Sequence, residues 1–399
     1  MNAPALRVFV ARCETYDPQT VQQKVDAAFG AFGGVGRFVR PGMRVLVKPN
    51  LLLAAPPEKA VTTHPAVVEA AVRLLLDAGA KVTIGDSPGI VHGTKAAEKA
   101  GILDVAQRLG VKVIDFDDPV ELKTPDGFLF KRIEVARAVA EADAIINLPK
   151  FKSHGQMVMT LAVKNLFGCV VGHRKAQWHM AAGRDHDTFA RLLLELSALV
   201  APAFSVVDGV IGMDGNGPSA GRVRPVNVIL AGDDPLAIDR IGARIAGLDD
   251  ARFPLIRAAR KMPACARGLG RIEVVGDPVD SVKLADFNLP MASDLQWLRL
   301  KPVRRLLKRA ITARPAIDRA RCEACGVCVC SCPPRAMTIA EGQVTIDRSL
   351  CISCFCCQEM CPQHAVDVRH GWLARILFQR SRPHARSSGD NTLRDSGNR

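Results

Sequence analysis

Short apolar runs alternate with amphipathic stretches through the first three-quarters of the chain. Residues 6–13 and 43–52 are mostly apolar and are bounded by polar residues, proline or glycine, as buried strands are. The stretch from Thr62 to Gly79 repeats apolar residues every three or four positions, which is typical of a helix packed on a sheet. We expect further strands at 81–89, 111–118, 142–150, the start of 204–218, 226–232 and 271–280, with helices at about 18–32, from about 95, at 188–200 and after 234. This alternation predicts an α/β fold with a mainly parallel sheet.

Polar side chains follow several of these strands. Lys48 and Asn50 end one strand, Asp86 and Ser87 end the next, and Asn147 lies in a later one. Ligands bind at the carboxyl ends of the strands in open α/β sheets. The shared position of these groups therefore predicts a binding site.

Residues 147–179 carry the densest set of reactive side chains. Lysines bind carboxylates or phosphates as point charges, and imidazoles ordinarily titrate near neutral pH. We therefore predict an anion-binding reductive site. Its candidate catalytic residues are Lys150, Lys152, His154, Lys164 and His179, and its candidate substrate-binding residues are Lys48, Asn50, His64, Asp86, Ser87, Asn165 and Lys175.

Other interpretations of the same segment stay open. The lysines could be solvated and the histidines locally packed. A histidine metal site is a further alternative, although the spacing is wider than in usual metal motifs. Its ligands would be His154, His173, His179 and His186. Asp208 and Asp214 could bind a metal or an amine, or cap a turn.

Three motifs within this part of the chain resemble a known family. They are P-K-x-K-x-H from residue 149, T-x-A-x-K-N-x-x-G from residue 160 and K-x-x-x-H from residue 175, with Lys48-Pro49-Asn50 and Thr63-His64-Pro65 upstream. The pattern is similar to the DUF362 family and extends over residues 6–290. The resemblance implies an α/β domain with a shared pocket, and it leaves the substrate open.

Eight cysteines near the C-terminus form two copies of one spacing, C-x-x-C-x-x-C-x-x-x-C-P. The copies begin at Cys322 and Cys351, and the 29-residue offset also aligns Asp318 with Asp347. This spacing is that of the bacterial run that ligates [4Fe–4S] clusters. A zinc site usually draws its ligands from two separated pairs, and a disulfide framework belongs in small secreted chains, so both are disfavoured.

Residues 315–371 thus resemble a bacterial-type ferredoxin domain with two [4Fe–4S] clusters. In such domains the fourth cysteine of each run ligates the other cluster. The resemblance implies one cluster on Cys322, Cys325, Cys328 and Cys361, and a second on Cys332, Cys351, Cys354 and Cys357. Cys330 and Cys356 fall outside the pattern and are interpreted as non-ligands.

The net charge of +14 is concentrated beside the cysteine repeat. Residues 291–314 are predicted to be a basic amphipathic linker and residues 372–399 a basic, disordered tail. The linker could pack on the protein, bind an acidic partner, or contact nucleic acid or a membrane; packing is favoured, since no recognition fold accompanies the charge.

Neither a signal peptide nor a membrane span is visible in the sequence, so we expect a cytoplasmic protein. The predicted domains are 1–290, a DUF362-like α/β domain, and 315–371, the cluster domain. We predict an iron–sulfur protein that transfers electrons between an unidentified redox partner and an anionic small molecule in the α/β domain. The alternative is a regulatory or binding protein whose clusters are structural or redox-sensing.

Overall fold

The computed structural model describes residues 5–89, 91–172, 174–183, 185–265, 267–290, 313–369 and 371. The predicted basic linker, except residues 313 and 314, and the predicted tail lie outside these residues, as does His173. Residues up to 292 and residues 314–369 belong to one compact unit.

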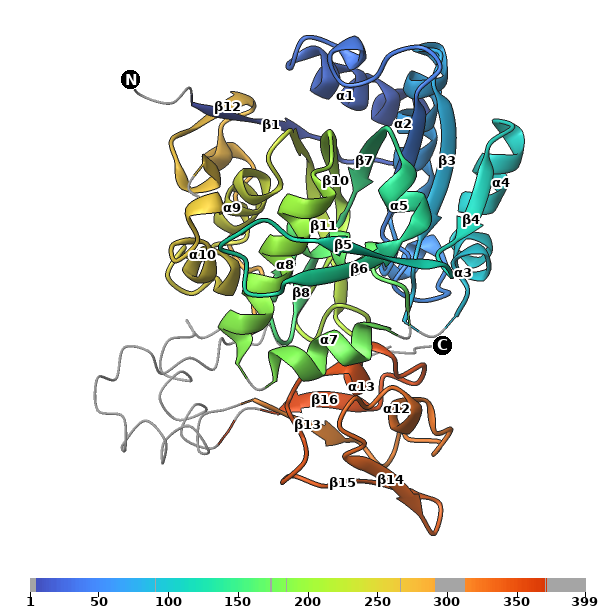
Figure 1. Cartoon of the computed structure of the whole chain (residues 1–399), viewed down its shortest axis with the longest axis vertical. Coiled ribbons are helices and arrows are strands. Elements are labelled where there is room, and N and C mark those ends of the chain that lie inside the picture. Colours follow the sequence, from blue (N-terminus) through green and yellow to red (C-terminus); the bar gives the residue numbers. More distant parts are fainter. Residues whose placement is uncertain are drawn as a thin grey trace, which may run out of the picture. The chain divides into compact units, whose positions relative to one another are not determined.

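The central element is a ten-stranded sheet with the order β12-β1-β11-β10-β7-β2-β3-β4 (Figure 1). Strand β8 also pairs with β10, and β9 pairs with β8. Neighbours are parallel except around β11, which is antiparallel to β1 and β10, and between β8 and β9. The mainly parallel α/β fold is therefore confirmed. The strands are β1 (Leu6–Arg12), β2 (Arg44–Pro49), β3 (Lys81–Asp86), β4 (Lys112–Asp115), β7 (Ala144–Leu148), β8 (Lys150–His154), β9 (Val158–Thr160), β10 (Phe204–Asp214), β11 (Arg222–Gly232) and β12 (Ile272–Gly276).

Two apolar cores cover the two faces of the sheet. Along β2, Leu46 belongs to one core while Val45 and Val47 belong to the other, as the period of two in a strand requires. The first core includes residues of α8, α9 and α10, and the second includes residues of α1, α2 and α4. The helices are α1 (Pro18–Gly30), α2 (Pro65–Asp77), α3 (Gly93–Lys99), α4 (Ile102–Arg108), α5 (Arg137–Glu141), α6 (Ala162–Asn165), α7 (Arg174–Ala182), α8 (His186–Val200), α9 (Pro235–Ile245) and α10 (Pro254–Ala259).

The chain after β7 differs from the sequence prediction. One strand was expected over 142–150, but β7 ends at Leu148 and the chain resumes as β8. Pro149 cannot donate to a sheet ladder, and beyond it Lys150 pairs with Asp208 of β10. Lys152 and His154 consequently lie in a buried strand instead of following one.

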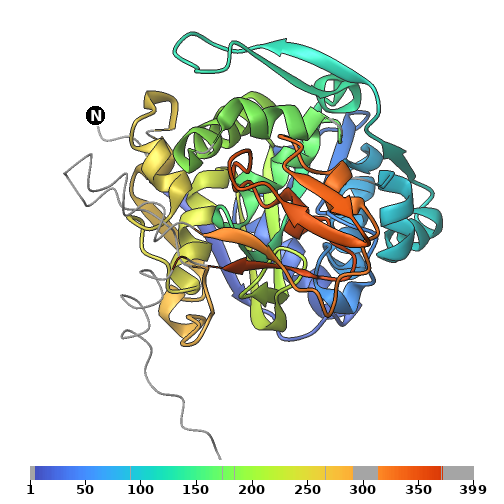
Figure 2. The same cartoon turned by 90° about the horizontal axis from the view of Figure 1, so that it is seen from below.

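A hairpin of β5 (Pro119–Lys123) and β6 (Arg132–Ala136) was not predicted. Figure 2 shows it as the teal pair of strands at the top of the view. Its turn is held by Glu195 of α8, which accepts hydrogen bonds from the backbone N–H groups of Leu129 and Phe130. The strands are short and partly exposed, so their apolar pattern is weak.

Residues 313–369, called the cysteine region below, form two small antiparallel pairs and two short helices. β13 (Arg314–Ile317) pairs with β16 (Val366–Arg369), and β14 (Met337–Ala340) pairs with β15 (Gln343–Ile346). The helices are α12 (Val327–Cys330) and α13 (Cys356–Glu359).

The backbone of the cysteine region repeats with the same 29-residue offset as its cysteines. Left-handed φ angles recur at Ala324 and Ser353, at Gly326 and Phe355, and at Arg335 and His364. The copies also exchange equivalent hydrogen bonds, from Asp318 N to Ala365 O and from Asp347 N to Ala336 O. The doubled unit inferred from the sequence is therefore present in the backbone.

Candidate functional site

Each of two small cavities in the cysteine region is lined by four cysteines. One is lined by Cys322, Cys325, Cys328 and Cys361, and the other by Cys332, Cys351, Cys354 and Cys357. Each set combines three cysteines of one copy with the fourth of the other. These are the two ligand sets implied by the ferredoxin resemblance.

The donor chemistry of both cavities suits a thiolate-ligated cluster. Four sulfur atoms line each cavity, and four of the eight cysteines (Cys328, Cys354, Cys357 and Cys361) are buried. The backbone N–H of Ala336 donates to Cys332 Sγ and that of Ala365 to Cys361 Sγ, both at 3.2 Å. Such hydrogen bonds stabilise negative sulfur.

A larger cavity of about 360 Å³ lies at the carboxyl ends of β2 and β3. Eight of the twelve predicted catalytic and substrate-binding residues line it: Asn50, Asp86, Ser87, Lys152, Lys164, Asn165, Lys175 and His179. Helices α12 and α13 complete its wall with Cys330, Ser331, Cys356, Glu359 and Met360. Lys48, His64, Lys150 and His154 are absent from the lining.

Three lysines line the cavity, and they differ in their hydrogen bonds and in their pKa values. Lys152 Nζ donates to Asn50 Oδ1 at 2.8 Å and to Val61 O at 2.7 Å, and burial lowers its pKa well below the usual value. Lys175 Nζ donates to the Ser87 carbonyl, and burial lowers its pKa to about 8. Among the described residues Lys164 has no hydrogen-bond partner, and its ammonium lies 5.9 Å from the Phe167 ring centroid. Lys164 is thus the one of these three lysines without a hydrogen bond to the described residues, although its charge attracts the Glu359 carboxylate in the same lining.

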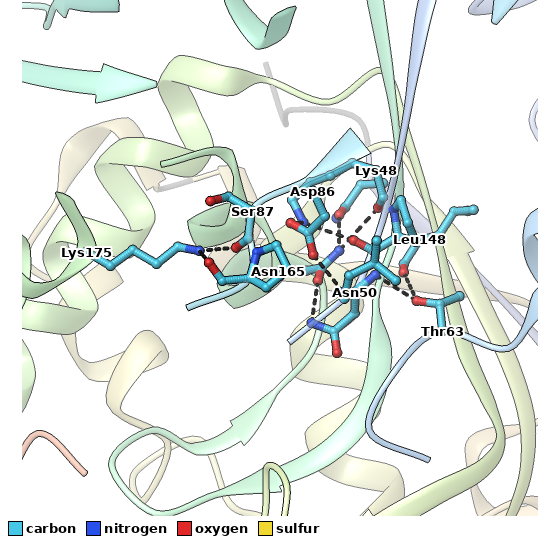
Figure 3. Close-up of polar contacts among 12 residues, drawn as sticks. Lys48, Asn50, Thr63, Asp86, Ser87, Leu148, Asn165 and Lys175 are labelled. Atoms are coloured by element: carbon cyan, nitrogen blue, oxygen red, sulfur yellow. Dashed lines mark hydrogen bonds and ion pairs between the residues drawn. The ribbon is translucent and has the colours of Figure 1, made fainter. Parts of the chain in front are cut away.

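An amide network fixes the polar floor of the cavity (Figure 3). Asn50 Nδ2 donates to Asn165 Oδ1 at 3.0 Å, and Asn165 Nδ2 donates to Asn147 Oδ1 at 2.8 Å. Because both amides of Asn50 and Asn165 are engaged, these side chains are held in one orientation before any ligand binds.

Two histidines near the cavity are neutral at pH 7. Burial lowers the pKa of His154 to about 4 and that of His179 to about 3, which differs from the titration near neutral pH expected from the sequence. His154 Nδ1 accepts backbone N–H groups from Gln156 and Met157, so Nε2 carries the proton, and Nε2 lies 2.7 Å from the carboxylate of Glu359. This carboxylate comes from the cysteine region.

The histidine metal site considered above is not assembled by the described residues. The three-residue group with suitable donor spacing in that part of the chain joins His179 to Cys354 and Cys356, not to His154 or His186.

Lys150 and His64 belong to a buried network outside the cavity lining. Lys150 Nζ lies 2.7 Å from both Asp208 Oδ2 and Tyr16 OH, while Tyr16 OH donates to Asp208 Oδ1. The His64 ring stacks on Tyr16 at 3.5 Å, and His64 N donates to Asp208 Oδ2. Asp208 therefore pairs with the amine of Lys150 and does not cap a turn.

Asp214 is the last residue of β10. Its carboxylate accepts hydrogen bonds from Arg222 and Arg224 and from the backbone N–H of Asn288. These charge-assisted contacts lower its pKa despite burial. They engage the carboxylate in local structure, and it does not line the larger cavity.

Comparisons with known proteins place this architecture in a family. The model of a domain of unknown function, DUF362, matches residues 45–244, which is half of the chain. The chain belongs to the DUF362 family. It is 38% identical over 255 residues to a thylakoid-associated protein of Synechocystis sp., covering 64% of this chain and 79% of that protein.

Two solved structures have distant similarity to this DUF362 protein. The lactate racemase apoprotein from Thermoanaerobacterium thermosaccharolyticum aligns with a TM-score of 0.40 and 13% identity, over 62% of this chain and 59% of that one. A protein from Thermotoga maritima aligns with a TM-score of 0.37 and 14% identity, over 65% and 60%. In the described residues, no helix has the length and apolar character needed to cross a membrane.

The ion pair of Lys48 and Asp86 explains one glycine of the DUF362 motifs. Lys48 Nζ and Asp86 Oδ1 form a fully buried ion pair at 2.7 Å, and Asp86 Oδ2 also accepts the Leu51 N–H. Gly168, the last residue of the second motif, packs directly on this pair: a Cβ there would overlap Asp86 Oδ1 and lie 2.6 Å from Lys48 Nζ. The motif glycine thus makes room for the ion pair beside the cavity.

Replacing Gly168 with alanine should destabilise the DUF362 domain. The methyl group would push apart Lys48 and Asp86, and overpacking of this kind costs roughly 1–3 kcal/mol. Urea unfolding should show the loss, and Gly36→Ala is the control because a Cβ there meets nothing within 4 Å. Equal stabilities for Gly168→Ala and the wild type would refute the packing argument.

The residues that the sequence did not reveal come from α13. Gln358 Nε2 donates to Asn216 O at 2.9 Å, Ser219 Oγ donates to Glu359 O at 3.0 Å, and the Met360 side chain packs against Gly89. Val368 and Phe355 lie next to Gly155, where an added Cβ would be 3.2 Å from Val368 Cγ2 and 3.6 Å from Phe355 Cγ. The sequence places Glu359 between Cys357 and Cys361. It does not reveal the contacts of Glu359 with His154 and Ser219, which lie more than 130 positions away.

Proposed function

We propose that this DUF362 protein binds two [4Fe–4S] clusters and transfers electrons to or from a small anionic ligand in the larger cavity. The observation that carries the proposal is the α13 segment, which lies between Cys354 and Cys361 and also forms part of the cavity wall. When bound, the clusters would supply electron-transfer chemistry. The ligand cavity and the ligating cysteines would then be neighbours.

The chain's own residues account for anion binding. Lys164 offers an ammonium with no hydrogen-bond partner among the described residues, and Lys175 adds a second, largely protonated below pH 8. Asn50 and Asn165 orient the ligand through fixed amides. Glu359 offsets part of this charge, because attraction to Lys164 lowers the pKa of its carboxyl group despite burial.

The proposal includes the wider context predicted from the sequence. It comprises a cluster domain at 315–371, a separate redox partner and a cytoplasmic location, where thiols stay reduced. In this account Lys48, His64, Lys150 and His154 support the site from outside the cavity lining.

Lys164→Gln should weaken anion binding by about 10-fold or more, because a charge-assisted hydrogen bond contributes about 1.5–3 kcal/mol. The experiment titrates inorganic phosphate into anaerobically reconstituted protein, following heat release and the EPR spectrum of the reduced protein. Wild-type protein should bind phosphate and change its EPR line shape.

Lys112→Gln is the matched control, since Lys112 is an exposed lysine on β4 outside the cavity. It should retain wild-type binding. Phosphate binding that survives in Lys164→Gln, or binding that leaves the EPR spectrum unchanged, would count against an anion site coupled to the clusters.

A further inference from the structure

His179 lies between the cavity and the second set of cysteines. It lines the cavity, and one of its ring nitrogens is within 4.8 Å of the sulfur atoms of Cys354 and Cys356. The side chain is buried, and among the described residues Nδ1 has no hydrogen-bond partner. A buried imidazole nitrogen without a partner is costly, so this position calls for a function or a ligand.

Aromatic packing fixes the orientation of His179. Its ring stacks on Phe189 with a centroid distance of 4.4 Å and meets Phe167 edge-on at 5.6 Å. Both neighbours are buried. The two aromatic rings therefore restrict rotation of the imidazole, which keeps a ring nitrogen within 4.8 Å of the two sulfur atoms.

Cys356, at the start of α13, also lies close to the sulfur atom of Cys354. Its sulfur lies within 4.8 Å of the Cys354 sulfur and of a ring nitrogen of His179. Cys356 also lines the cavity, although it lies outside both quartets. One wall of the cavity thus consists of two side chains, His179 and Cys356, that both approach Cys354.

We infer that His179 and Cys356 are positioning residues that tune the cluster held by Cys332, Cys351, Cys354 and Cys357, and that this cluster is the one coupled to the cavity. The inference rests on the proposed function. It adds which of the two clusters communicates with the ligand, and through which side chains.

The first quartet lacks an equivalent connection within the described residues. None of the eight quartet cysteines lines the larger cavity, but Cys354 of the second quartet lies beside His179 and Cys356, which do. Cys330, from the first copy, does line it, but Cys330 is not part of the group formed by His179, Cys354 and Cys356. Cys330 is therefore a matched control: a second cavity-lining thiol without the same contact.

Polar groups close to a ligating sulfur tune the potential of a cluster, and a donor raises it by stabilising the more negative, reduced form. His179→Phe and Cys356→Ala should each shift one of the two potentials to a more negative value and leave the other in place. Cys356→Ser keeps a donor at the same position, so its potential should stay close to that of the wild type. Cys330→Ala should change neither potential.

The experiment is an EPR-monitored potentiometric titration of the full-length, anaerobically reconstituted protein, with the iron content of every variant measured in parallel. The shifted signal should be the one that Cys351→Ser removes and Cys325→Ser spares. Phosphate should perturb that same signal in the wild type and perturb it less in His179→Phe.

Three results would overturn the inference while leaving cluster binding intact. They are unchanged potentials in both His179→Phe and Cys356→Ala, an equal shift in Cys330→Ala, and a shift in the signal that Cys325→Ser removes. Absence of iron from the wild-type protein would instead refute the proposed function itself, so the two failures are distinguishable.

Discussion

Replacing Cys361 with serine should remove about half of the bound iron, about four of about eight atoms, by loss of the cluster assigned to the first run. Cys361 belongs to the second run, yet it shares a cavity with Cys322, Cys325 and Cys328. Iron and sulfide analysis of anaerobically reconstituted protein measures the loss. Cys330→Ser, outside both quartets, should retain the full content.

Double variants separate interleaved ligation from ligation within each copy. Combining Cys361→Ser with Cys325→Ser damages one quartet twice, so the iron content should fall no further than in Cys361→Ser. Combining Cys361→Ser with Cys354→Ser damages both quartets and should remove nearly all iron. The opposite order of the two double variants would show that each run ligates its own cluster.

Asp208→Ala should lower the free energy of unfolding by about 3–5 kcal/mol, because it leaves the Lys150 ammonium buried without its counter-charge. Both partners of this pair are almost completely buried, and Asp208 also accepts hydrogen bonds from Tyr16 and His64. Denaturant unfolding followed by circular dichroism measures the change.

Two controls define what the buried pair does. Removing both charges in Lys150→Met/Asp208→Leu should recover much of the loss, whereas Glu121→Ala, which breaks an exposed pair with Arg132, should cost less than about 1 kcal/mol. If the double variant also keeps phosphate binding, Lys150 has a structural role. Wild-type stability in Asp208→Ala would contradict the network described here.

The sequence was most informative where spacing alone carries the chemistry. The cysteine repeat carried the resemblance to two-cluster ferredoxin domains, and that resemblance implied the two quartets that line the two small cavities. Strand ends predicted the cavity because parallel strands bring Asn50 and Asp86 to one edge of the sheet. A shared edge does not determine which side chain faces the cavity, so Lys150 and His64 were grouped with residues they do not join.

Contacts between distant segments were the part that could not be predicted. Beyond the break at Pro149 the chain forms β8, most of which lies outside the strand predicted over 142–150, and β8 buries His154 opposite Glu359. The approach of His179 to Cys354 depends on how α7 and α13 pack, and no local pattern in either helix signals it. A role for Cys356 likewise follows only from its neighbours in the folded chain, His179 and Cys354.

Metal and sulfide analysis of the full-length protein, purified and handled without oxygen, tests the central claim most directly. The account predicts about eight iron and about eight sulfide per chain, with visible absorption that bleaches on reduction. Colourless protein, or protein that carries zinc in place of iron and sulfide, would contradict it.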